Sequence, residues 1–155
     1  SIRNGLWGLR DAGCTEDDII LVHDGVRPLV AERIITENIE KCRKYGYAIT
    51  GMICKEAIMQ KVDDCVKNID IPRERLVRTQ TPHTYPLGTL LKAHAEADAK
   101  GIDGTVASCT LMAELGVDNQ HLVMGSEKNG LKLTQTEDVE LFKALKHTTK
   151  DEWLK

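Results

Sequence analysis

One short segment constrains the fold of this chain most: an apolar run, Ile19-Ile20-Leu21, followed by Val22-His23-Asp24-Gly25-Val26-Arg27-Pro28. Its continuous hydrophobicity predicts a strand, Ile19–His23, buried on both faces as in a parallel sheet. Ligands of open parallel sheets bind beyond the carboxyl ends of the strands. An acid, a glycine and an arginine within four residues at that place indicate a phosphate and metal site, and equally suit a strand-to-loop turn with a surface ion pair.

The residue types in this segment define the chemistry that it can perform. Asp24 can hold a hard cation, Gly25 lets the backbone approach a ligand closely, and Arg27 can bind a phosphate through its two-pronged guanidinium group. We therefore treat these three residues as candidates for a phosphate and metal site.

Length and composition restrict the class of protein. A chain of 155 residues, 41% hydrophobic and 29% charged, predicts one domain. The net charge of −3 disfavours a nucleic-acid surface. The sequence contains no apolar stretch of about 18 residues and no secretory signal, so we expect a cytoplasmic protein without a membrane partner. Five widely spaced cysteines without a C-x-x-C pair favour free buried thiols over a disulfide framework or a zinc site.

Periodic patterns predict alternating helices and strands in the first third of the chain. Apolar residues at helical spacing predict a helix near the N-terminus, with a stop at Gly13, and a second helix over residues 31–44 that ends at Gly46. Ile34, Ile35, Ile39 and Cys42 form the apolar stripe of the second helix. A strand follows over residues 47–53, and this β-α-β order predicts a parallel pair of strands with a right-handed crossover.

The middle of the chain predicts a β-arm rather than a separate domain. Two strand-like runs, residues 57–62 and 65–69, flank Asp63-Asp64, and a third resumes at residues 76–80. Polar residues interleave along all three, so we expect one face to contact solvent or a partner. The predicted arm spans residues 55–80 approximately.

The remainder predicts three helices and two short strands. The helices cover residues 86–100, 106–115 and a C-terminal segment with Thr136 as its N-cap, and the strands cover residues 121–124 and 131–133. In the last helix, Val139, Phe142 and Leu145 are expected to form the buried face.

Two further clusters carry phosphate-binding groups. Arg73, Arg75 and Arg78 precede Thr79-Gln80-Thr81-Pro82-His83, a proline-bounded loop whose hydroxyl and amide groups suit a sugar phosphate. A solvated charge cluster beside a turn is the alternative. Lys132 lies between apolar neighbours in a predicted strand, where it is either a phosphate ligand or an edge lysine with its charge in water.

Taken in order, these segments resemble the cytidylyltransferases that act on sugar-alcohol phosphates, the methylerythritol 4-phosphate and ribitol 5-phosphate enzymes. The matching stretches are Ser1-Ile2-Arg3-Asn4-Gly5-Leu6, His23-Asp24-Gly25-Val26-Arg27-Pro28, Gln80-Thr81-Pro82, and Leu131-Lys132-Leu133-Thr134 with Glu137-Asp138. The resemblance implies an α/β, Rossmann-like three-layer nucleotidyltransferase fold with a projecting β-arm. It also implies transfer of CMP from CTP to a polyol phosphate with release of pyrophosphate, assisted by Mg²⁺.

The resemblance assigns roles to seven residues. Asp24 corresponds to the metal-associated acid, and the catalytic group also includes Arg27 and Lys132. Gly25 and Ser1 correspond to nucleotide contacts, with Ser1 near the base. Thr81 and Lys132 correspond to polyol-phosphate contacts. Arg73 corresponds to an arm arginine that reaches the partner subunit's site, because family members are homodimers with interlocked arms.

The chain also departs from the family pattern. No Gly-x-Gly-x-Arg, the family's triphosphate loop, occurs in the 155 residues, and the sequence begins within an amphipathic helix. We therefore expect residues 1–155 to be a single domain, the C-terminal two thirds of a cytidylyltransferase, and not competent alone. The pair Gly25-Val26 favours the ribitol-phosphate branch of the family. The alternative function is a non-catalytic, dimerising α/β interaction module. A phosphatase or reductase is disfavoured because neither D-x-D nor G-x-G-x-x-G is present.

Overall fold

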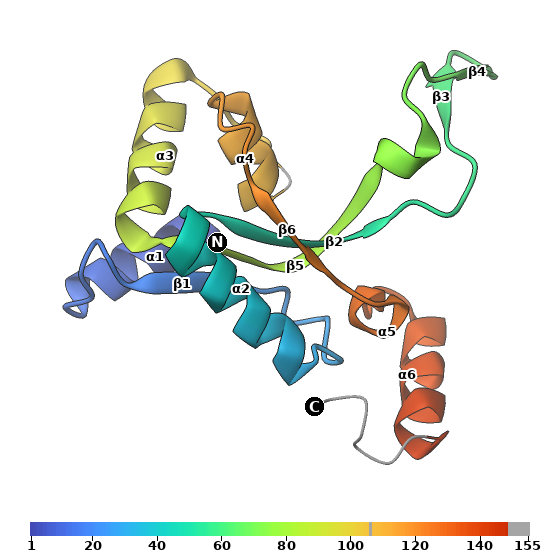
Figure 1. Ribbon diagram of the computed structural model, residues 1–155, viewed down its shortest axis with the longest axis horizontal. Coiled ribbons are helices and arrows are strands. Elements are labelled where there is room, and N and C mark those ends of the chain that lie inside the picture. Colours follow the sequence, from blue (N-terminus) through green and yellow to red (C-terminus); the bar gives the residue numbers. More distant parts are fainter. Residues whose placement is uncertain (106, 149–155) are drawn as a thin grey trace.

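The computed structural model describes residues 1–105 and 107–148. Its elements in chain order are α1 (Ile2–Asp11), β1 (Ile19–Val22), α2 (Glu32–Tyr45), β2 (Ala48–Ile53), β3 (Met59–Val62), β4 (Cys65–Asn68), a single 3₁₀ turn (Arg73–Arg75), β5 (Val77–Pro86), α3 (Leu87–Lys100), α4 (Ser108–Glu114), β6 (His121–Met124), α5 (Glu127–Gly130) and α6 (Thr136–Thr148). Figure 1 shows a sheet flanked by helices, with a hairpin projecting from one end.

The main sheet has the strand order β1-β5-β2-β6 in the described residues. β5 runs antiparallel to both β1 and β2, whereas β2 and β6 are parallel. The predicted parallel pairing of the first two strands is therefore wrong in one respect. β1 and β2 point the same way, but β5 returns from the arm and lies between them. The mixed α/β architecture itself agrees with the expected fold class.

β5 is an internal strand of the main sheet, and it includes residues that sequence patterns place in a loop. It continues unbroken through Thr79-Gln80-Thr81-Pro82-His83, the segment predicted to be a proline-bounded loop. The register against β2 shifts at this point, since Ile49 lies opposite His83 and the next residue, Thr50, lies opposite Gln80. Thr81 and Pro82 are thus the extra residues of a bulge, which is where a central strand tolerates proline.

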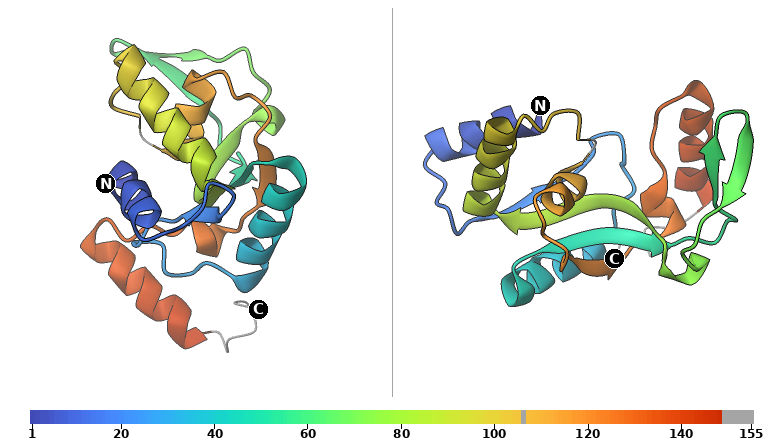
Figure 2. Two further views of the ribbon diagram at one scale, coloured as in Figure 1. Left: turned by 90° about the vertical axis from the view of Figure 1, so that its left-hand side faces the viewer. Right: turned by 90° about the horizontal axis from the view of Figure 1, so that it is seen from above.

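Two apolar clusters cover the two faces of the sheet, as in a three-layer fold. One joins α1, α3 and α4 to the end of β5 through Leu6, Tyr85, Leu87, Leu90, Leu111 and neighbouring residues. The other joins α2 to β2 and β6 through Ile34, Cys42, Ala48 and Val123. In Figure 2, α2 lies on the opposite side of the sheet from α1 and α3.

The apolar stripe of α2 contains a buried polar residue that its pattern does not predict. Ile34 and Cys42 are buried as expected, but Asn38 between them is 0% exposed. Its Nδ2 donates to Ile34 O (2.7 Å) and Thr50 Oγ1 (2.9 Å), and its Oδ1 accepts from Thr84 Oγ1 (3.2 Å). One amide therefore connects α2 to both β2 and β5.

The projecting hairpin agrees with the predicted arm. β3 and β4 form a separate two-stranded antiparallel sheet, and Asp63 at its turn has a φ of 52°, in the left-handed region. The returning chain joins the main sheet at Val77, opposite Ile53 of β2. Several large apolar side chains of the arm are exposed: Ile58, Met59, Val66 and Ile71.

Several elements in the C-terminal third of the chain differ from expectation. Leu131–Leu133 is irregular chain after α5, not a strand. α6 begins at Thr136, and the carboxylate of Asp138, not Thr136, accepts the backbone N–H groups of Thr134 and Gln135 (both 2.8 Å). Val139 is 37% exposed, whereas Phe142 and Leu145 are half-buried, so the predicted buried face of α6 is only partly covered. α4 begins at Ser108, and Val106, at the start of the predicted helix, lies outside the described residues.

The five cysteines are free thiols, of which Cys42, Cys54 and Cys109 are buried, whereas Cys65 is exposed. No helix in the described ranges combines the length and apolar character needed to cross a membrane.

The Asn38 network gives a test of the α2–sheet contact. We expect Asn38→Ala to lower the free energy of unfolding by about 2 to 3 kcal/mol, because it removes three hydrogen bonds and leaves the buried Thr84 hydroxyl without its acceptor. Urea denaturation measures this change. Thr36→Ala, at an exposed position of the same helix, is the control, and an equal effect of both substitutions would contradict a special role for Asn38.

Candidate functional site

One cavity of about 150 Å³ brings together the carboxyl end of β1, the bulge of β5, the start of α4 and the segment after α5. Asp24, Arg27, Thr81 and Lys132 all line it, so four residues selected from distant parts of the sequence converge. The remaining lining residues are Ile2, Val22, Thr79, Gln80, His83, Ala107 and Ser108.

Asp24 is the centre of a charged triad in this cavity. The turn after β1, closed by Arg27 N–H donating to Asp24 O (2.9 Å), brings Arg27 Nε within 3.1 Å of Asp24 Oδ2. Lys132 Nζ lies 3.4 Å from the same oxygen. Partial burial raises the pKa of Asp24, but the hydrogen bond from Arg27 and the charge of Lys132 outweigh it, so the pKa lies below its ordinary value. Asp24 is therefore ionised at neutral pH.

The guanidinium group of Arg27, which we expected to bind a phosphate, uses two of its nitrogens to contact protein groups. Nε donates to Asp24, and Nη1 donates to the backbone carbonyl of Gly130 (2.5 Å). Its side chain is only 13% exposed, against 45% for Lys132. Of these two cations, Lys132 is the more accessible to an incoming anion.

Thr81 connects β5 to the turn that carries Asp24. Its Oγ1 accepts from Asp24 N–H (3.1 Å) and lies 3.0 Å from His23 Nδ1. His23 Nε2 lies 2.9 Å from Arg27 O, and a carbonyl only accepts, so Nε2 carries the ring proton. In the neutral ring Nδ1 then accepts the Thr81 hydroxyl proton. The hydroxyl keeps one acceptor lone pair for a further donor.

Lys132 is positioned by its neighbours rather than by a strand. Leu133 N–H donates to Val26 O (2.9 Å), which joins the segment after α5 to the turn after β1. α5 itself begins at Ser126, whose side chain accepts from Asn129 N–H (3.1 Å). The strand expected at residues 131–133 is thus replaced by a short helix and an extended connection with the same result, a lysine beside Asp24.

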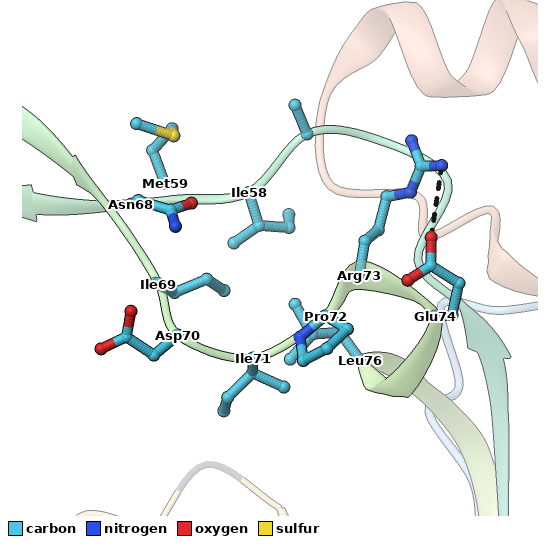
Figure 3. A pocket seen from close by; sticks show the side chains of 11 residues that line it. Ile58, Met59, Asn68, Ile69, Asp70, Ile71, Pro72, Arg73, Glu74 and Leu76 are labelled. Atoms are coloured by element: carbon cyan, nitrogen blue, oxygen red, sulfur yellow. Dashed lines mark ion pairs between the residues drawn. The ribbon is translucent and has the colours of Figure 1, made fainter.

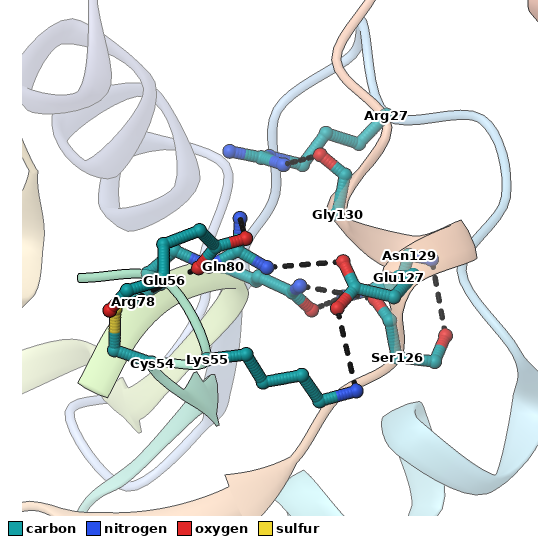
Figure 4. A network of polar contacts seen from close by, with 10 residues as sticks. All are labelled: Arg27, Cys54, Lys55, Glu56, Arg78, Gln80, Ser126, Glu127, Asn129 and Gly130. Atoms are coloured by element: carbon teal, nitrogen blue, oxygen red, sulfur yellow. Dashed lines mark hydrogen bonds and ion pairs between the residues drawn. The ribbon is translucent and has the colours of Figure 1, made fainter. Parts of the chain in front are cut away.

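Sequence patterns assign no individual role to three residues of the cavity or its support, although two of them, Gln80 and His83, belong to the segment 79–83 that was selected for a sugar phosphate. His83 is 2% exposed and lines the cavity, and within the described chain its Nε2 has no hydrogen-bond partner. The pKa of His83 is lowered to about 4, mainly by burial, so its imidazole ring is neutral at neutral pH. Gln80 and Asn129 are buried and hydrogen-bonded to each other (2.8 Å), as drawn in Figure 4. No pattern marks a polar residue as buried when its partner is distant in the sequence.

Ser1 and Gly25, the residues expected to contact a nucleotide, lie at the margins of this cavity. Ser1 lines a neighbouring cavity of about 250 Å³, which shares Ile2, Ala107 and Ser108 with the first. Gly25 is exposed, and a Cβ built there would meet no protein atom within 4 Å. Packing within the described chain does not require glycine at position 25.

Arg73 does not join the other candidates within one chain. It lies in the arm, where it lines a cavity of about 540 Å³ between β3, β4 and the 3₁₀ turn (Figure 3). Its Nη1 donates to Lys55 O (3.1 Å), and Nη2 lies 3.7 Å from Glu74 Oε1. A role for Arg73 near Asp24 thus needs a second copy of the chain.

The residues present fit a cation held mainly by a ligand, not a protein cage for a metal. Across the described ranges no group of three or more histidine, cysteine or carboxylate side chains is placed to bind a metal ion. Asp24 supplies one carboxylate, and both cationic contacts are on Oδ2, which leaves Oδ1 for a metal. One carboxylate with several phosphate oxygens is a usual environment of Mg²⁺.

Comparison with known proteins identifies relatives over nearly the whole chain. The family described as "IspD: 2-C-methyl-D-erythritol 4-phosphate cytidylyltransferase" matches residues 1–147. A ribitol-5-phosphate cytidylyltransferase of Lacticaseibacillus paracasei is 42% identical over 93% of this chain and 61% of its own length. A 2-C-methyl-D-erythritol 4-phosphate cytidylyltransferase of Clostridium acetobutylicum is 35% identical over 90% and 57%, respectively.

Solved structures agree with these relatives. The crystal structure of 2-C-methyl-D-erythritol 4-phosphate cytidylyltransferase from Thermus thermophilus superimposes with a TM-score of 0.78 at 26% identity, over 96% of this chain and 68% of that chain. The present chain spans about 60% of the length of the curated relatives that it matches.

The charged triad predicts a measurable change at Asp24. Because Lys132 is one of the groups that lower the pKa of Asp24, we expect Lys132→Met to raise this pKa towards its ordinary value. A ¹³C NMR titration of the Asp24 carboxyl carbon measures the shift. Lys143→Met, an exposed lysine of α6 paired with Glu140, is the control. An unchanged Asp24 pKa in Lys132→Met would contradict the contact.

The same pKa has a consequence for stability. Since the pKa in the folded state is depressed, ionised Asp24 stabilises the fold at neutral pH, and this contribution is lost as the pH falls below about 4.

Proposed function

Because this chain belongs to the 2-C-methyl-D-erythritol 4-phosphate cytidylyltransferase family, we propose that it forms the polyol-phosphate and metal side of a cytidylyltransferase site. The reaction is transfer of CMP from CTP to a polyol phosphate, with release of pyrophosphate. One observation carries the proposal: Asp24, Arg27, Thr81 and Lys132, far apart in sequence, line one cavity.

In this proposal Lys132 binds the phosphate of the polyol. That phosphate is the nucleophile, and one of its oxygens must approach the α-phosphorus of CTP in line with the departing pyrophosphate. Lys132 is the more exposed cation of the triad, and its contact with Asp24 holds it beside the cavity before a ligand arrives. Its contribution is to orient the nucleophile and to offset its negative charge.

Thr81 and Arg27 are proposed to arrange the cavity around the polyol. The Thr81 hydroxyl holds the backbone of Asp24 and retains an acceptor lone pair for a hydroxyl of the substrate. Arg27 fixes the Asp24 carboxylate and the carbonyl of Gly130. The positive charge that it brings also favours binding of a phosphate at this place.

Mg²⁺ is proposed as the cofactor, with Asp24 as its protein ligand. When bound with the phosphates, the cation supplies positive charge against the departing pyrophosphate. Asp24 suits this role because it is ionised and carries both of its protein contacts on Oδ2. Ser1 and Gly25 are proposed to contact the nucleotide, which agrees with the open surface at Gly25 and the neighbouring cavity at Ser1.

The arm is proposed to bind a second copy of the chain. Its exposed apolar residues, Ile58, Met59, Val66 and Ile71, would be covered in such a homodimer. Arg73 would then reach the site of the partner subunit. The same surface also favours a second candidate function, a dimerising interaction module without catalysis, and ligand binding distinguishes the two.

Isothermal titration calorimetry tests the ligand class. We expect the chain to bind ribitol 5-phosphate or 2-C-methyl-D-erythritol 4-phosphate, with one clear preference between them. Lys132→Met should weaken binding about tenfold or more, because it removes a charged hydrogen-bond donor to the phosphate. Lys143→Met carries the same charge change outside the cavity and should bind like the parent.

Absence of binding to either polyol phosphate, with the fold intact, would leave the interaction module as the better proposal. Pyrophosphate release from CTP by the full product of the gene measures the reaction itself.

Analytical ultracentrifugation tests the arm. Val66 is 63% exposed on β4, so Val66→Asp puts a charge into the proposed contact between copies, and we expect it to shift the chain towards monomer. Asn68→Asp adds the same charge on the same strand without removing apolar surface, and a smaller effect is expected. A parent chain that sediments as a monomer at all accessible concentrations would contradict the dimer.

A further inference from the structure

A buried pair of amides lies directly beneath the candidate site. Asn129 is 0% and Gln80 is 4% exposed. Asn129 Nδ2 donates to Gln80 Oε1 (2.8 Å) and to Thr81 O (3.1 Å), and Gln80 Nε2 donates to Ser126 O (3.0 Å). Figure 4 shows the two side chains bridging β5 and α5. Three hydrogen bonds thus hold α5 against the bulge of the central strand.

Two glycines shape the space for the Gln80 side chain. A Cβ built at Gly125 would overlap Gln80 Oε1, and one built at Gly130 would meet Gln80 Nε2 at 2.7 Å. Both approaches are shorter than real Cβ contacts. The side chain of Gln80 therefore fits between the backbone that precedes α5, at Gly125, and the backbone of the last residue of α5, Gly130.

The segment held by this pair supports each charged residue of the site. Gly130 directly follows Asn129, and its carbonyl accepts from Arg27 Nη1. Three residues further on, Leu133 N–H donates to Val26 O (2.9 Å). Lys132 lies between these two contacts and reaches Asp24. The amide pair is thus connected to Arg27 and to Lys132 through single short stretches of backbone.

A second contact between β5 and α5 is an ion pair at the surface, and it contributes less to stability than the buried amide pair. Arg78 Nη2 and Glu127 Oε2 are 3.0 Å apart, with side chains 44% and 59% exposed. Exposed ion pairs contribute little to stability, whereas a buried donor left without its acceptor is costly. The position of α5 depends chiefly on the buried amides.

We propose that Gln80 and Asn129 are positioning residues, which hold the segment 126–133 so that Lys132 and Arg27 meet Asp24. Gln80 lines the cavity but is 4% exposed, and its amide oxygen and nitrogen are both hydrogen-bonded to protein groups, so the proposed role acts through Lys132 and Arg27. The proposal rests on the proposed function for its effect on ligand binding, whereas its effect on the segment is independent of any ligand.

Amide hydrogen exchange measured by NMR tests the positioning directly. Asn129→Asp keeps the shape but replaces the Nδ2 donor by an oxygen that faces two acceptors. We expect exchange of the Leu133 amide to accelerate about tenfold or more, with exchange of Val123, a core residue of β6, unchanged. Gln80→Glu retains the acceptor for Asn129 but places a carboxylate oxygen against Ser126 O in a buried position, so it should give a change of the same kind and serves if Asn129→Asp fails to fold.

Two further readouts separate positioning from general stability. Release of Lys132 from Asp24 should raise the Asp24 pKa in Asn129→Asp, and affinity for ribitol 5-phosphate or 2-C-methyl-D-erythritol 4-phosphate should fall about tenfold. The control is Glu127→Gln, an isosteric change on the same helix that removes the exposed ion pairs and should leave all three readouts at the parent values.

The outcomes are distinct. Equal acceleration at Leu133 and Val123, or no acceleration at Leu133 in a folded Asn129→Asp protein, would overturn the positioning role. A parent chain that binds neither polyol phosphate would count against the proposed function alone, because hydrogen exchange and the Asp24 pKa still test the amide pair.

Discussion

The candidate site depends on the hydrogen bonds of Thr81, a residue in the middle of the central strand. Its side chain accepts from the backbone of Asp24, and its carbonyl accepts from Asn129 Nδ2. The two segments that it holds lie 57 residues before it and 48 residues after it. Thr81 lies in the bulge of β5, and its position is fixed by the paired residues on both sides of the bulge: β2 pairs with β5 before and after it, and β1 pairs with β5 from His83 onwards. The cavity is therefore built around a rigid strand rather than from loops alone.

Most helices and strands can be predicted from the sequence, because the pattern that defines each one lies in residues that are close together in the chain. The helices α2 and α3 end at Gly46 and Gly101, as apolar periodicity followed by glycine predicts. The hairpin of the arm follows from two alternating runs around Asp63-Asp64. Only the first part of the central strand, within the run predicted at residues 76–80, could be found in this way, and residues 81–86 could not. Its polar residues and two prolines are typical of a loop, and they are buried only because Asn38 and Asn129, from distant segments, supply their partners.

The same reasoning explains why the predicted strand pairing was wrong and why four of the candidate residues lie in one cavity. Periodicity shows that β1 and β2 are strands but carries no information on which edges pair, and the arm allows β5 to return between them. The resemblance selected Asp24, Arg27, Thr81 and Lys132 by the order of short motifs, and they share a cavity. It placed Gln80 in one of these motifs but assigned no role to Gln80, Asn129 or His83, because the role of a buried polar residue depends on partners that are distant in the sequence.

The charges of the triad show how such a cavity can be both stable when empty and receptive to a phosphate. Asp24 with Arg27 and Lys132 carries a net charge of +1, so the cavity attracts an anion while its carboxylate is satisfied. Lys132 is the member that can exchange partners, since it is about half exposed and 3.4 Å from Asp24, whereas Arg27 is nearly buried and bonded to Gly130 as well. A phosphate that draws Lys132 away leaves Asp24 with Arg27 and with Oδ1 open to a cation. In the proposed function, anion and cation binding therefore favour each other through a single carboxylate.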